Sequence, residues 1–319
     1  MNNEYLLNQF PPDFHAKMIG KLLGDGTITK QFGRKARFQF SHTAKDKDWT
    51  FYCYQQIVSF FSLSKPIYRK TIDQRLEAGY SESYMVQSHT SPIIDTLEEL
   101  WYEHRKKVLP LDYISKYFNA VSLAWWYQDD GSLKQENNFP RKIILSTECF
   151  TKKERQFLQM LLLEKFNLLF KQDKQNRMIL YDASSIFYFL SLIEQYIQPS
   201  MTRKIIQNRT FQLKSTSSKR STIYLPNEII ITSPTKEINC ILTNLEIIWR
   251  LFRCELFYEQ IYKSNKSYIH SDIVKTPYQI VIQKKQLYLL HLLKVNTGLT
   301  FSQLTSLCFK LFNESENKK

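Results

Sequence analysis

Two apolar segments of this chain have the length of a buried helix, and each ends in aspartate followed by glycine. The first covers residues 18–26 and the second covers residues 122–131. Asp13, just after a Pro-Pro pair, can cap the first of these helices, because proline fits a first turn and aspartate accepts from its free N–H groups. We therefore predict two buried helices whose C-terminal ends carry Asp25 and Asp130.

The pattern that follows each segment repeats in the same order. Alternating polar and apolar residues predict strands, and apolar residues at helical spacing predict helices. After the first segment we predict strands at 37–41, 66–72 and 83–88 and helices at 48–61 and 92–101. After the second we predict strands at 142–146, 169–171 and 178–181 and helices at 152–166 and 184–196.

The two copies also agree in register, because 16 residues separate Asp25 from Ser41 and 16 separate Asp130 from Ser146. A half-sheet with one apolar face cannot bury itself alone, whereas two of them packed side by side can. We predict an α+β fold of two pseudo-symmetric αββαββα half-domains with a helical extension. The expected boundaries are 1–112 and 113–212 for the halves, 213–235 for a basic linker and 236–319 for a helical appendage of unknown role.

A net charge of +14 limits the classes of partner that we expect this chain to bind. Lysine and arginine in such excess suit a long polyanion such as DNA or RNA, because they displace condensed counterions from phosphates. Five cysteines without a Cys-x-x-Cys pair and six scattered histidines argue against a zinc site. No apolar run reaches ~18 residues, so we expect neither a membrane-spanning helix nor a membrane partner.

The two aspartates are candidates for a shared metal site. A helix C-terminus carries partial negative charge, so an aspartate there is unfavourable by roughly 0.3–1 kcal/mol, and two close together are worse. A divalent cation would neutralise them, and Mg²⁺ suits oxygen ligands of this kind. Two metals ~4 Å apart on a basic sheet would suit in-line hydrolysis of a phosphodiester. The alternative, an ordinary turn after each helix, is less favoured by the repeat and the positive charge.

Met18–Gly26 and Leu123–Gly131 resemble the two motifs of a single-chain, intron-encoded LAGLIDADG homing endonuclease. The resemblance also covers Lys-Lys-Val-Leu-Pro at 106–110 and Pro-Ser-Met-Thr-Arg-Lys at 199–204. It implies a β-saddle over double-stranded DNA and a monomer that cuts both strands at a long target site, with Mg²⁺ or with Mn²⁺ as a substitute. Asp25 and Asp130 would then be the catalytic metal ligands, and the backbone of Gly24 and Asp129 could supply further ligands.

The resemblance also implies one catalytic lysine in each half, near the scissile phosphates. Lys107 before Val-Leu-Pro matches one, and Lys204 after Pro-Ser-Met-Thr-Arg matches the other. Each would stabilise developing phosphorane charge or polarise the water network around the metal. Lys106 and Arg203 are neighbouring alternatives, and a surface lysine in a basic patch is the other interpretation.

The chain departs from the motif of this family at two positions. The first copy has the small residues Gly20 and Gly24, which allow close helix contact, whereas the second has Trp125 and Asp129 there. We therefore expect a less symmetric helix pair. Asp129 either assists at the metal or caps its turn, and we favour the cap.

Basic and polar residues of the predicted strands and turns are expected to contact DNA, mostly at phosphates and partly at base edges. These candidates are Lys30, Arg34, Lys35, Arg37, Gln39, Arg69, Lys70, Arg75, Lys134, Arg141, Lys142, Lys171, Lys174 and Arg177.

Two other functions remain open. One is an RNA maturase that binds its host group I intron and assists its splicing. The other is a catalytically silent DNA-binding regulator with residues 286–312 as a helix-turn-helix. The N-terminus has no signal or transit character, and residue usage suits an AT-rich genome. We expect an organelle, chloroplast or mitochondrion, with a bacterial cytoplasm as the alternative.

Overall fold

The computed structural model describes residues 3–206, 220–271 and 273–312. By their contacts these residues form two compact units. The first unit holds residues 3–181 and 189–206, and the second holds 182–188, 220–271 and 273–312. Among the helices of these ranges, none is both long enough and apolar enough to cross a bilayer.

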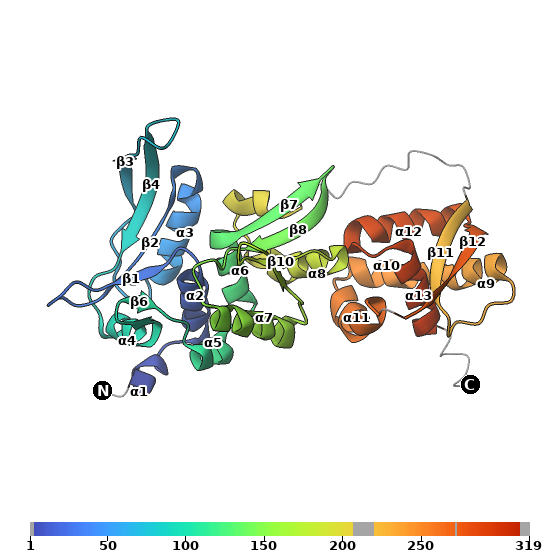
Figure 1. Cartoon of the computed structure of the whole chain (residues 1–319), viewed down its shortest axis with the longest axis horizontal. Coiled ribbons are helices and arrows are strands. Elements are labelled where there is room, and N and C mark those ends of the chain that lie inside the picture. Colours follow the sequence, from blue (N-terminus) through green and yellow to red (C-terminus); the bar gives the residue numbers. More distant parts are fainter. Residues whose placement is uncertain (1–2, 207–219, 272, 313–319) are drawn as a thin grey trace. The chain divides into compact units, whose positions relative to one another are not determined.

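The first unit contains the repeat, except for residues 183–188 of its last helix, in the αββαββα order that we expected (Figure 1). The first half consists of α2 (Pro12–Leu23), β1 (Thr27–Thr29), β2 (Arg37–Thr43), α3 (Lys47–Ile57), β3 (Ile67–Ile72), β4 (Tyr80–Gln87) and α4 (Pro92–Trp101). The second half consists of α6 (Ala120–Asp130), β7 (Gly131–Glu136), β8 (Phe139–Leu145), α7 (Lys152–Phe166), β9 (Lys171–Gln172), β10 (Met178–Leu180) and α8 (Ala183–Ile193). The α+β class and the two half-domains are therefore confirmed.

Short elements connect and extend the halves. They are α1 (Asn3–Leu7), the hairpin of β5 (Tyr102–Glu103) and β6 (Lys106–Lys107), α5 (Leu111–Tyr117) and 3-10 helices at Ala44–Asp46, Glu194–Tyr196 and Pro199–Lys204.

The two sheets are built alike, with strand orders β1-β2-β4-β3 and β7-β8-β10-β9 and antiparallel pairing throughout. In the first sheet Thr27 lies opposite Gln39, and in the second Ser132 lies opposite Ile144. Both members of the second pair are 105 positions beyond those of the first (132 − 27 and 144 − 39), which is also the offset from Asp25 to Asp130. The repeat thus holds residue by residue across the first strand pair.

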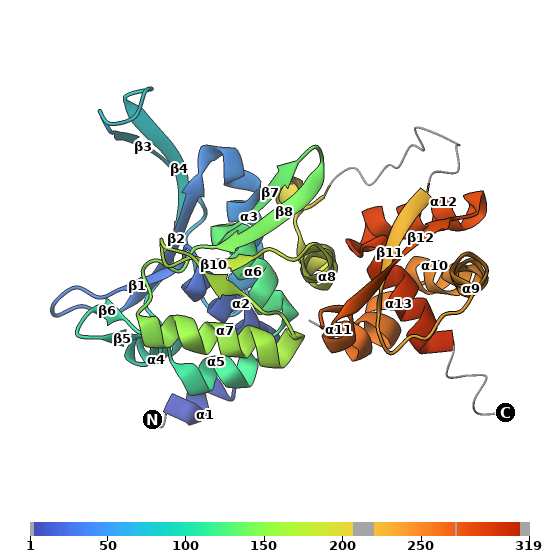
Figure 2. The same cartoon turned by 45° about the vertical axis from the view of Figure 1, so that its right-hand side comes forward.

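Helices α2 and α6 lie side by side at the centre of the first unit, as Figures 1 and 2 both show. Their apolar composition is explained by this position, since Trp125, Trp126 and Tyr127 are almost wholly buried. The helices touch at Gly20, where an added Cβ would lie 2.5 Å from the Cβ of Trp125 and 2.8 Å from the carbonyl oxygen of Ser122. Glycine on one helix therefore makes room for tryptophan on the other.

The second unit pairs helices with a small sheet. Its elements are β11 (Arg220–Pro226), α9 (Pro234–Ile241), a 3-10 turn (Leu242–Asn244), α10 (Leu245–Arg253), a π-helix (Tyr258–Tyr262), α11 (Lys263–Ile269), β12 (Lys275–Val281), α12 (Lys284–Thr297) and α13 (Phe301–Phe312). Strands β11 and β12 pair along their whole length.

This arrangement corrects two boundaries. The expected linker at 213–235 contains a strand, and the expected helical appendage at 236–319 contains that strand's partner. The pairing escaped prediction because 48 residues separate the two strands (Pro226 to Lys275), and neither strand shows a long polar–apolar alternation. The part of the linker before residue 220 lies outside the described residues.

The helix-turn-helix interpretation of residues 286–312 does not fit α13. Gly298, with φ +73°, joins α12 to α13 in the left-handed conformation that glycine favours. However, α13 packs against β11, α9, α11 and α12, and it buries every residue from Leu304 to Phe309. A recognition helix needs a face free to enter a groove, whereas α13 is the central helix of this unit.

The close helix crossing predicts the effect of a larger residue at Gly20. We expect Gly20→Val to destabilise the first unit by about 1–3 kcal/mol, because overpacking forces the helices apart. Urea unfolding followed by tryptophan fluorescence measures this, since four of the five tryptophans (49, 101, 125 and 126) lie in this unit. Gln55→Val on the exposed face of α3 controls for the β-branched residue. Equal midpoints for the two variants would contradict the crossing.

Candidate active site

Asp25 and Asp130 stand at the C-terminal ends of α2 and α6. Burial raises the pKa of Asp25 to about 6, and the negative charge of Asp129 adds to this effect. Burial also raises the pKa of Asp130 to about 7, with further contributions from Asp25 and Asp129. Asp25 thus raises the pKa of Asp130, and the nearby lysines only partly offset the effect of burial on the two carboxyls.

This pair fits a divalent cation. The Asp25 side chain is 37% exposed, so its oxygens can reach a ligand from solvent. A carboxylate whose pKa is raised by burial and by neighbouring carboxylates is stabilised when a cation replaces the proton. Hard oxygen ligands of this kind suit Mg²⁺ or a similar ion.

Lys107 and Lys204 each hold the carbonyl end of one of the two helices. Lys107 Nζ donates to the carbonyl oxygens of Leu22 and Gly26, both at 2.8 Å. Lys204 Nζ donates to the carbonyl oxygens of Gln128 at 2.5 Å and Asp129 at 3.1 Å. A cation at this end of a helix satisfies free carbonyls and offsets the helix dipole.

Burial lowers the pKa of both lysines, that of Lys204 to about 8. The nearby aspartates oppose this effect, so the ammonium groups feel the negative charge of the site. The sequence-predicted set of Asp25, Asp130, Lys107 and Lys204 is thus brought together at one end of the helix pair.

Local structure distinguishes Lys107 and Lys204 from Lys106 and Arg203, the neighbouring basic residues that were alternative candidates. The β5–β6 hairpin turns at His104 and Arg105, both with positive φ, and leaves Lys106 exposed while Lys107 is half-buried. Arg203 instead forms an ion pair with Asp46 at 2.9 Å.

Asp129 makes a buried network that the sequence did not predict. Its carboxylate, with no exposed surface, accepts from Lys21 Nζ at 2.9 Å and from Trp49 Nε1 at 2.7 Å. It also accepts from the backbone N–H of Asp25 at 3.1 Å. The expected cap of its own turn is therefore wrong: Asp129 crosses from α6 to α2 and holds the backbone of Asp25.

Gly24 explains why this crossing is possible. A Cβ on Gly24 would lie 2.5 Å from Asp129 Cβ and 2.6 Å from its Oδ2. The position that is glycine in the first copy thus receives the aspartate of the second, just as Gly20 receives Trp125.

The charges of this network compensate each other. Burial alone raises the pKa of Asp129, but the ammonium of Lys21 outweighs it and holds that pKa well below its usual range. Burial alone lowers the pKa of Lys21, and Asp129 reverses the direction. Burial and the charge of Lys21 lower the pKa of His42, which keeps its imidazole neutral.

The neutral His42 completes the network. Its Nε2 accepts from Lys21 at 2.9 Å, which leaves the proton on Nδ1 to donate to Thr50 Oγ1 at 2.8 Å. Ligand atoms of Asp25, His42 and Asp129 lie within 4.8 Å of one another, as in a metal site. However, the Lys21 ammonium is 2.9 Å from both His42 and Asp129, so a lysine takes the place of a cation there.

Sequence reasoning missed Lys21, His42 and Trp49. Lys21 offered a signal, because a lysine inside an apolar helix needs a buried carboxylate partner. That partner is 108 residues away in the chain, and only the helix crossing identifies it.

The predicted DNA-contact residues on the strands of the first half lie on opposite faces of its sheet. Alternation along β2 buries Phe38 and Phe40 and leaves Arg37 and Gln39 on the open face. Register places Arg69 of β3 on that same face, across Ser83 from Thr43. A hollow of about 300 Å³ follows this face; it is lined by Asp25, Thr27, Gln39, Phe40, Ser41, Arg69, Thr71, Ser83 and Met85.

Lys70 is placed on the opposite face. It alternates with Arg69 and shares its side of the sheet with Tyr68, Tyr80 and Tyr84. Its Nζ lies 3.7 Å from the ring centre of Tyr80, and Tyr84 packs on Phe51 of α3. Lys70 therefore does not lie on the open face that carries Arg37, Gln39 and Arg69.

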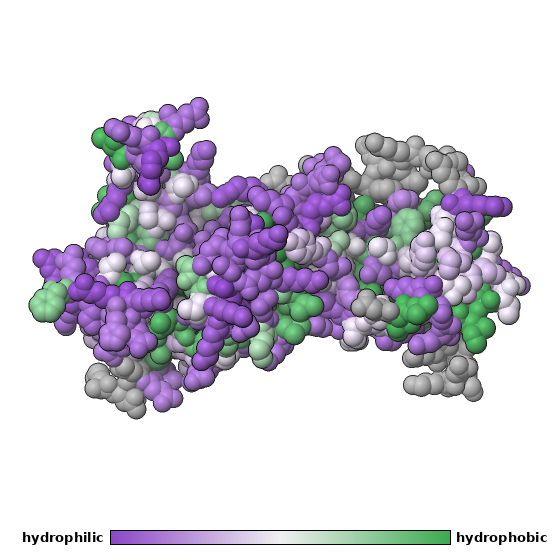
Figure 3. Space-filling view, in the orientation of Figure 1, coloured by the Kyte–Doolittle hydropathy of each residue, from purple (hydrophilic) through white to green (hydrophobic). Residues whose placement is uncertain are grey.

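In the second half Lys134 lies directly opposite Lys142, and register puts Lys171 on the same face. Arg141 falls on the other side of its strand and forms an ion pair with Glu136. In the view of Figure 3, hydrophilic residues cover most of the visible surface over β7 and β8.

The remaining candidates lie in turns. Arg34, Lys35 and Lys174 are exposed there. Lys30, Arg75 and Arg177 form ion pairs with Glu98, Asp73 and Asp173. These three would need to exchange an acid for a phosphate on binding.

Comparison with known proteins agrees with this architecture. The uncharacterized protein MJ1098 of Methanocaldococcus jannaschii is 30% identical over 209 residues, which cover 64% of this chain and 78% of the relative. The intron-encoded endonuclease ai4 of Dictyostelium discoideum is 33% identical over 130 residues, which cover 39% of this chain and 77% of the relative.

Among solved structures, the homing endonuclease I-WcaI bound to its DNA recognition sequence is similar, with a TM-score of 0.55 and 25% identity. The match covers 63% of this chain and 90% of that one. Residues 16–189 match the sequence profile of the LAGLIDADG DNA endonuclease family, and they span the helix pair, both sheets and the Asp25–Asp130 pair. The chain therefore belongs to the LAGLIDADG DNA endonuclease family.

Proposed function

We propose that this protein is a monomeric homing endonuclease that cuts both strands of double-stranded DNA at a long target site with a divalent metal ion. The observation that carries this proposal is the meeting of Asp25 and Asp130 at one end of two helices, each held by a lysine. Family membership supports the DNA endonuclease activity. Mg²⁺, with Mn²⁺ as a substitute, is the ion that we propose.

In this mechanism the open sheet faces bind the duplex, with Arg37, Gln39 and Arg69 in one half and Lys134 and Lys142 in the other. Basic side chains on such strands would contact phosphates, and polar ones would reach base edges in the major groove.

Asp25 and Asp130 would hold the metal with their carboxylates at the end of this surface. A divalent ion bound there supplies Lewis-acid activation of the phosphate and of water. Lys107 and Lys204, half-buried beside the carboxylates, would stabilise the negative charge that develops on the phosphate oxygens. Their bonds to the helix carbonyls hold both ammonium groups in position before DNA arrives.

The genetic setting that we propose is an intron of an organelle genome. The likeness to a relative named as an intron-encoded endonuclease supports the intron, and the residue usage supports an AT-rich genome. An RNA maturase for that intron is the alternative function, and the experiment below separates the two.

Removal of either carboxylate tests the metal site. A library of randomised duplexes selected for cleavage identifies the target. On that target, we expect Asp25→Asn and Asp130→Asn each to lower the single-turnover cutting rate with Mg²⁺ by at least roughly 10²-fold. Binding measured in Ca²⁺ should persist, because the basic faces are unchanged. Asp48→Asn, at an exposed position of α3, is the matched control. A wild-type protein that cuts no duplex but binds intron RNA tightly would favour the maturase instead.

The raised pKa values predict how metal binding depends on pH. Because Asp25 and Asp130 have pKa values of about 6 and 7, protons compete with the ion near neutrality, whereas ordinary carboxyls would already be ionised. The metal concentration needed for half-saturation should rise as pH falls from about 8 to about 6. Calorimetric Mn²⁺ titrations across this range measure it. A midpoint independent of pH would contradict the shared site.

The buried network predicts a role for Lys21 in positioning Asp25. Lys21→Met leaves Asp129 as an unpaired buried carboxylate, which costs about 3–5 kcal/mol of stability. The double variant Lys21→Met/Asp129→Asn should recover part of this stability, since no charge is left unpaired. It should still weaken Mn²⁺ binding by roughly 10–100-fold, because the bond to the Asp25 backbone is altered. Lys30→Met, which breaks an exposed pair with Glu98, should change neither property. Full metal affinity in the double variant would exclude the positioning role.

A further inference from the structure

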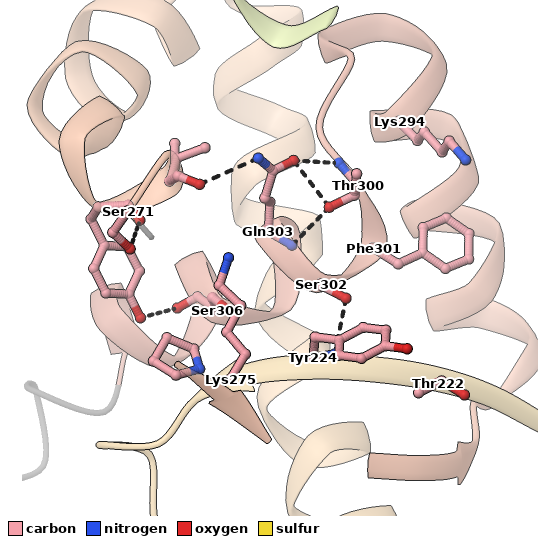
Figure 4. Close-up of a pocket in the computed structure, with 13 residues that line it drawn as sticks. Thr222, Tyr224, Ser271, Lys275, Lys294, Thr300, Phe301, Ser302, Gln303 and Ser306 are labelled. Atoms are coloured by element: carbon pink, nitrogen blue, oxygen red, sulfur yellow. Dashed lines mark hydrogen bonds between the residues drawn. The ribbon is translucent and has the colours of Figure 1, made fainter. Parts of the chain in front are cut away.

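The second unit contains a hollow of about 570 Å³ that the proposed cleavage reaction does not use. It lies between β11, the end of α11, the start of β12 and the first turns of α13 (Figure 4). This volume is within the range of small-molecule sites and exceeds what a single phosphate requires.

The lining of the hollow is positively charged. Lys275 of β12 and Lys294 of α12 both line it, and none of its 13 described lining residues is acidic. Neither lysine forms an ion pair within the described part of the chain; Lys294 Nζ lies 5.6 Å from the ring centre of Phe301. Figure 4 shows the Lys275 side chain beside Ser306 in the middle of the hollow, whereas Lys294 lies at its edge, beyond the ring of Phe301.

Hydrogen-bond donors add to this charge at the start of α13. Thr300 and Gln303 cap this end of the helix, because the Gln303 N–H donates to Thr300 Oγ1 at 3.2 Å. The backbone N–H groups of Phe301 and Ser302 remain without a partner inside the helix. The Ser302 hydroxyl lies in the same turn, where it accepts from the backbone N–H of Tyr224 at 3.0 Å and keeps its own proton to donate.

Ser306, one turn further along, adds a further polar group to the lining. The residue is only 8% exposed, and its backbone carbonyl accepts from the Tyr268 hydroxyl at 3.4 Å. Its side-chain hydroxyl can donate to a ligand in the hollow. Figure 4 shows Ser306, Ser302 and the Lys275 side chain around the same space.

Aromatic rings stand beside the donors. Tyr224 of β11 is 50% exposed, and Phe301 is at the start of α13. Rings of this kind offer stacking surfaces to bases without a preference for sequence. The hollow thus combines cations and donors for a phosphate with flat apolar faces for a ring.

We propose that this hollow is a nucleotide site, in which Lys275, Ser302 and Ser306 bind a phosphate, Lys294 adds positive charge at the edge, and Tyr224 or Phe301 stacks on the base. The nucleotide can belong to a nucleic-acid strand or be free. The site would give the chain a second nucleic-acid contact, separate from the sheet faces and independent of cleavage.

The test compares two lysine pairs in the full-length protein. Lys275→Gln/Lys294→Gln removes the two cations of the hollow. Lys236→Gln/Lys284→Gln removes the same charge from exposed positions of the same unit that do not line it. The probes are a labelled single strand of about 12 nucleotides, followed by fluorescence anisotropy at several salt concentrations, and adenosine monophosphate, followed by calorimetry.

We expect Lys275→Gln/Lys294→Gln to weaken binding of the strand roughly tenfold. The slope of log affinity against log salt concentration should become shallower by about 0.7 for each phosphate that is no longer neutralised. The control pair should have a much smaller effect, and Ser306→Val should reproduce part of the weakening without a change of charge. If binding of adenosine monophosphate depends on the same lysines, the ligand of the hollow is a free nucleotide. If only the single strand binds in this way, the ligand is a nucleic acid.

Equal effects of the two lysine pairs on the strand, with no lysine-dependent binding of the monophosphate, would overturn the proposal. Cleavage of the selected duplex is measured in parallel, and it should be unchanged within about twofold at saturating protein. A protein that cleaves nothing but binds the strand through these lysines would refute the proposed function and leave the nucleotide site intact.

Discussion

The close crossing of α2 and α6 is the constraint on which the first unit depends. It requires small residues on one helix, and Gly20 and Gly24 supply them. It also aligns two helix dipoles, so that two negative ends and the carboxyls of Asp25 and Asp130 meet in one place. The fold accepts this charge because Lys107 and Lys204 each bind one helix end.

The three aspartates at this crossing have divided roles. Asp129 is neutralised inside the protein by Lys21, and its pKa is lowered, whereas Asp25 and Asp130 keep raised pKa values. A carboxylate already paired with an ammonium has little to offer a metal, while the two unpaired ones do. The buried ion pair of Lys21 and Asp129 thus links the two helices. Asp25 and Asp130, which are partly exposed, remain as the carboxylates that can bind a metal ion.

Much of this could be predicted because the relevant signals are local or repeated. The Asp-Gly ends and the equal spacing of 16 residues from each aspartate to its strand identified the half-domains, and the strand pairing confirms their common register. Long-range side-chain partners were not predictable: Asp129 looked like a cap until the crossing placed it against Asp25 and Lys21. Adjacent basic residues posed a similar difficulty, since Arg69 and Lys70 were equal candidates until strand pairing put them on opposite faces. The pairing of β11 with β12 joins segments too far apart for any local pattern to reveal.

The departures from symmetry follow from joining both halves in one chain. In a symmetric pair of identical helices, a residue next to the twofold axis contacts the same residue of the other helix. The position of Gly20 would then pair glycine with glycine or tryptophan with tryptophan. Here each position meets its counterpart from the other half, and glycine accommodates tryptophan at one level and aspartate at the next. This complementarity fills the interface and adds a directional ion pair from α6 to α2. Because Asp129 supports the backbone of Asp25 alone, the two carboxylates are held by different means, and their affinities for metal need not be equal.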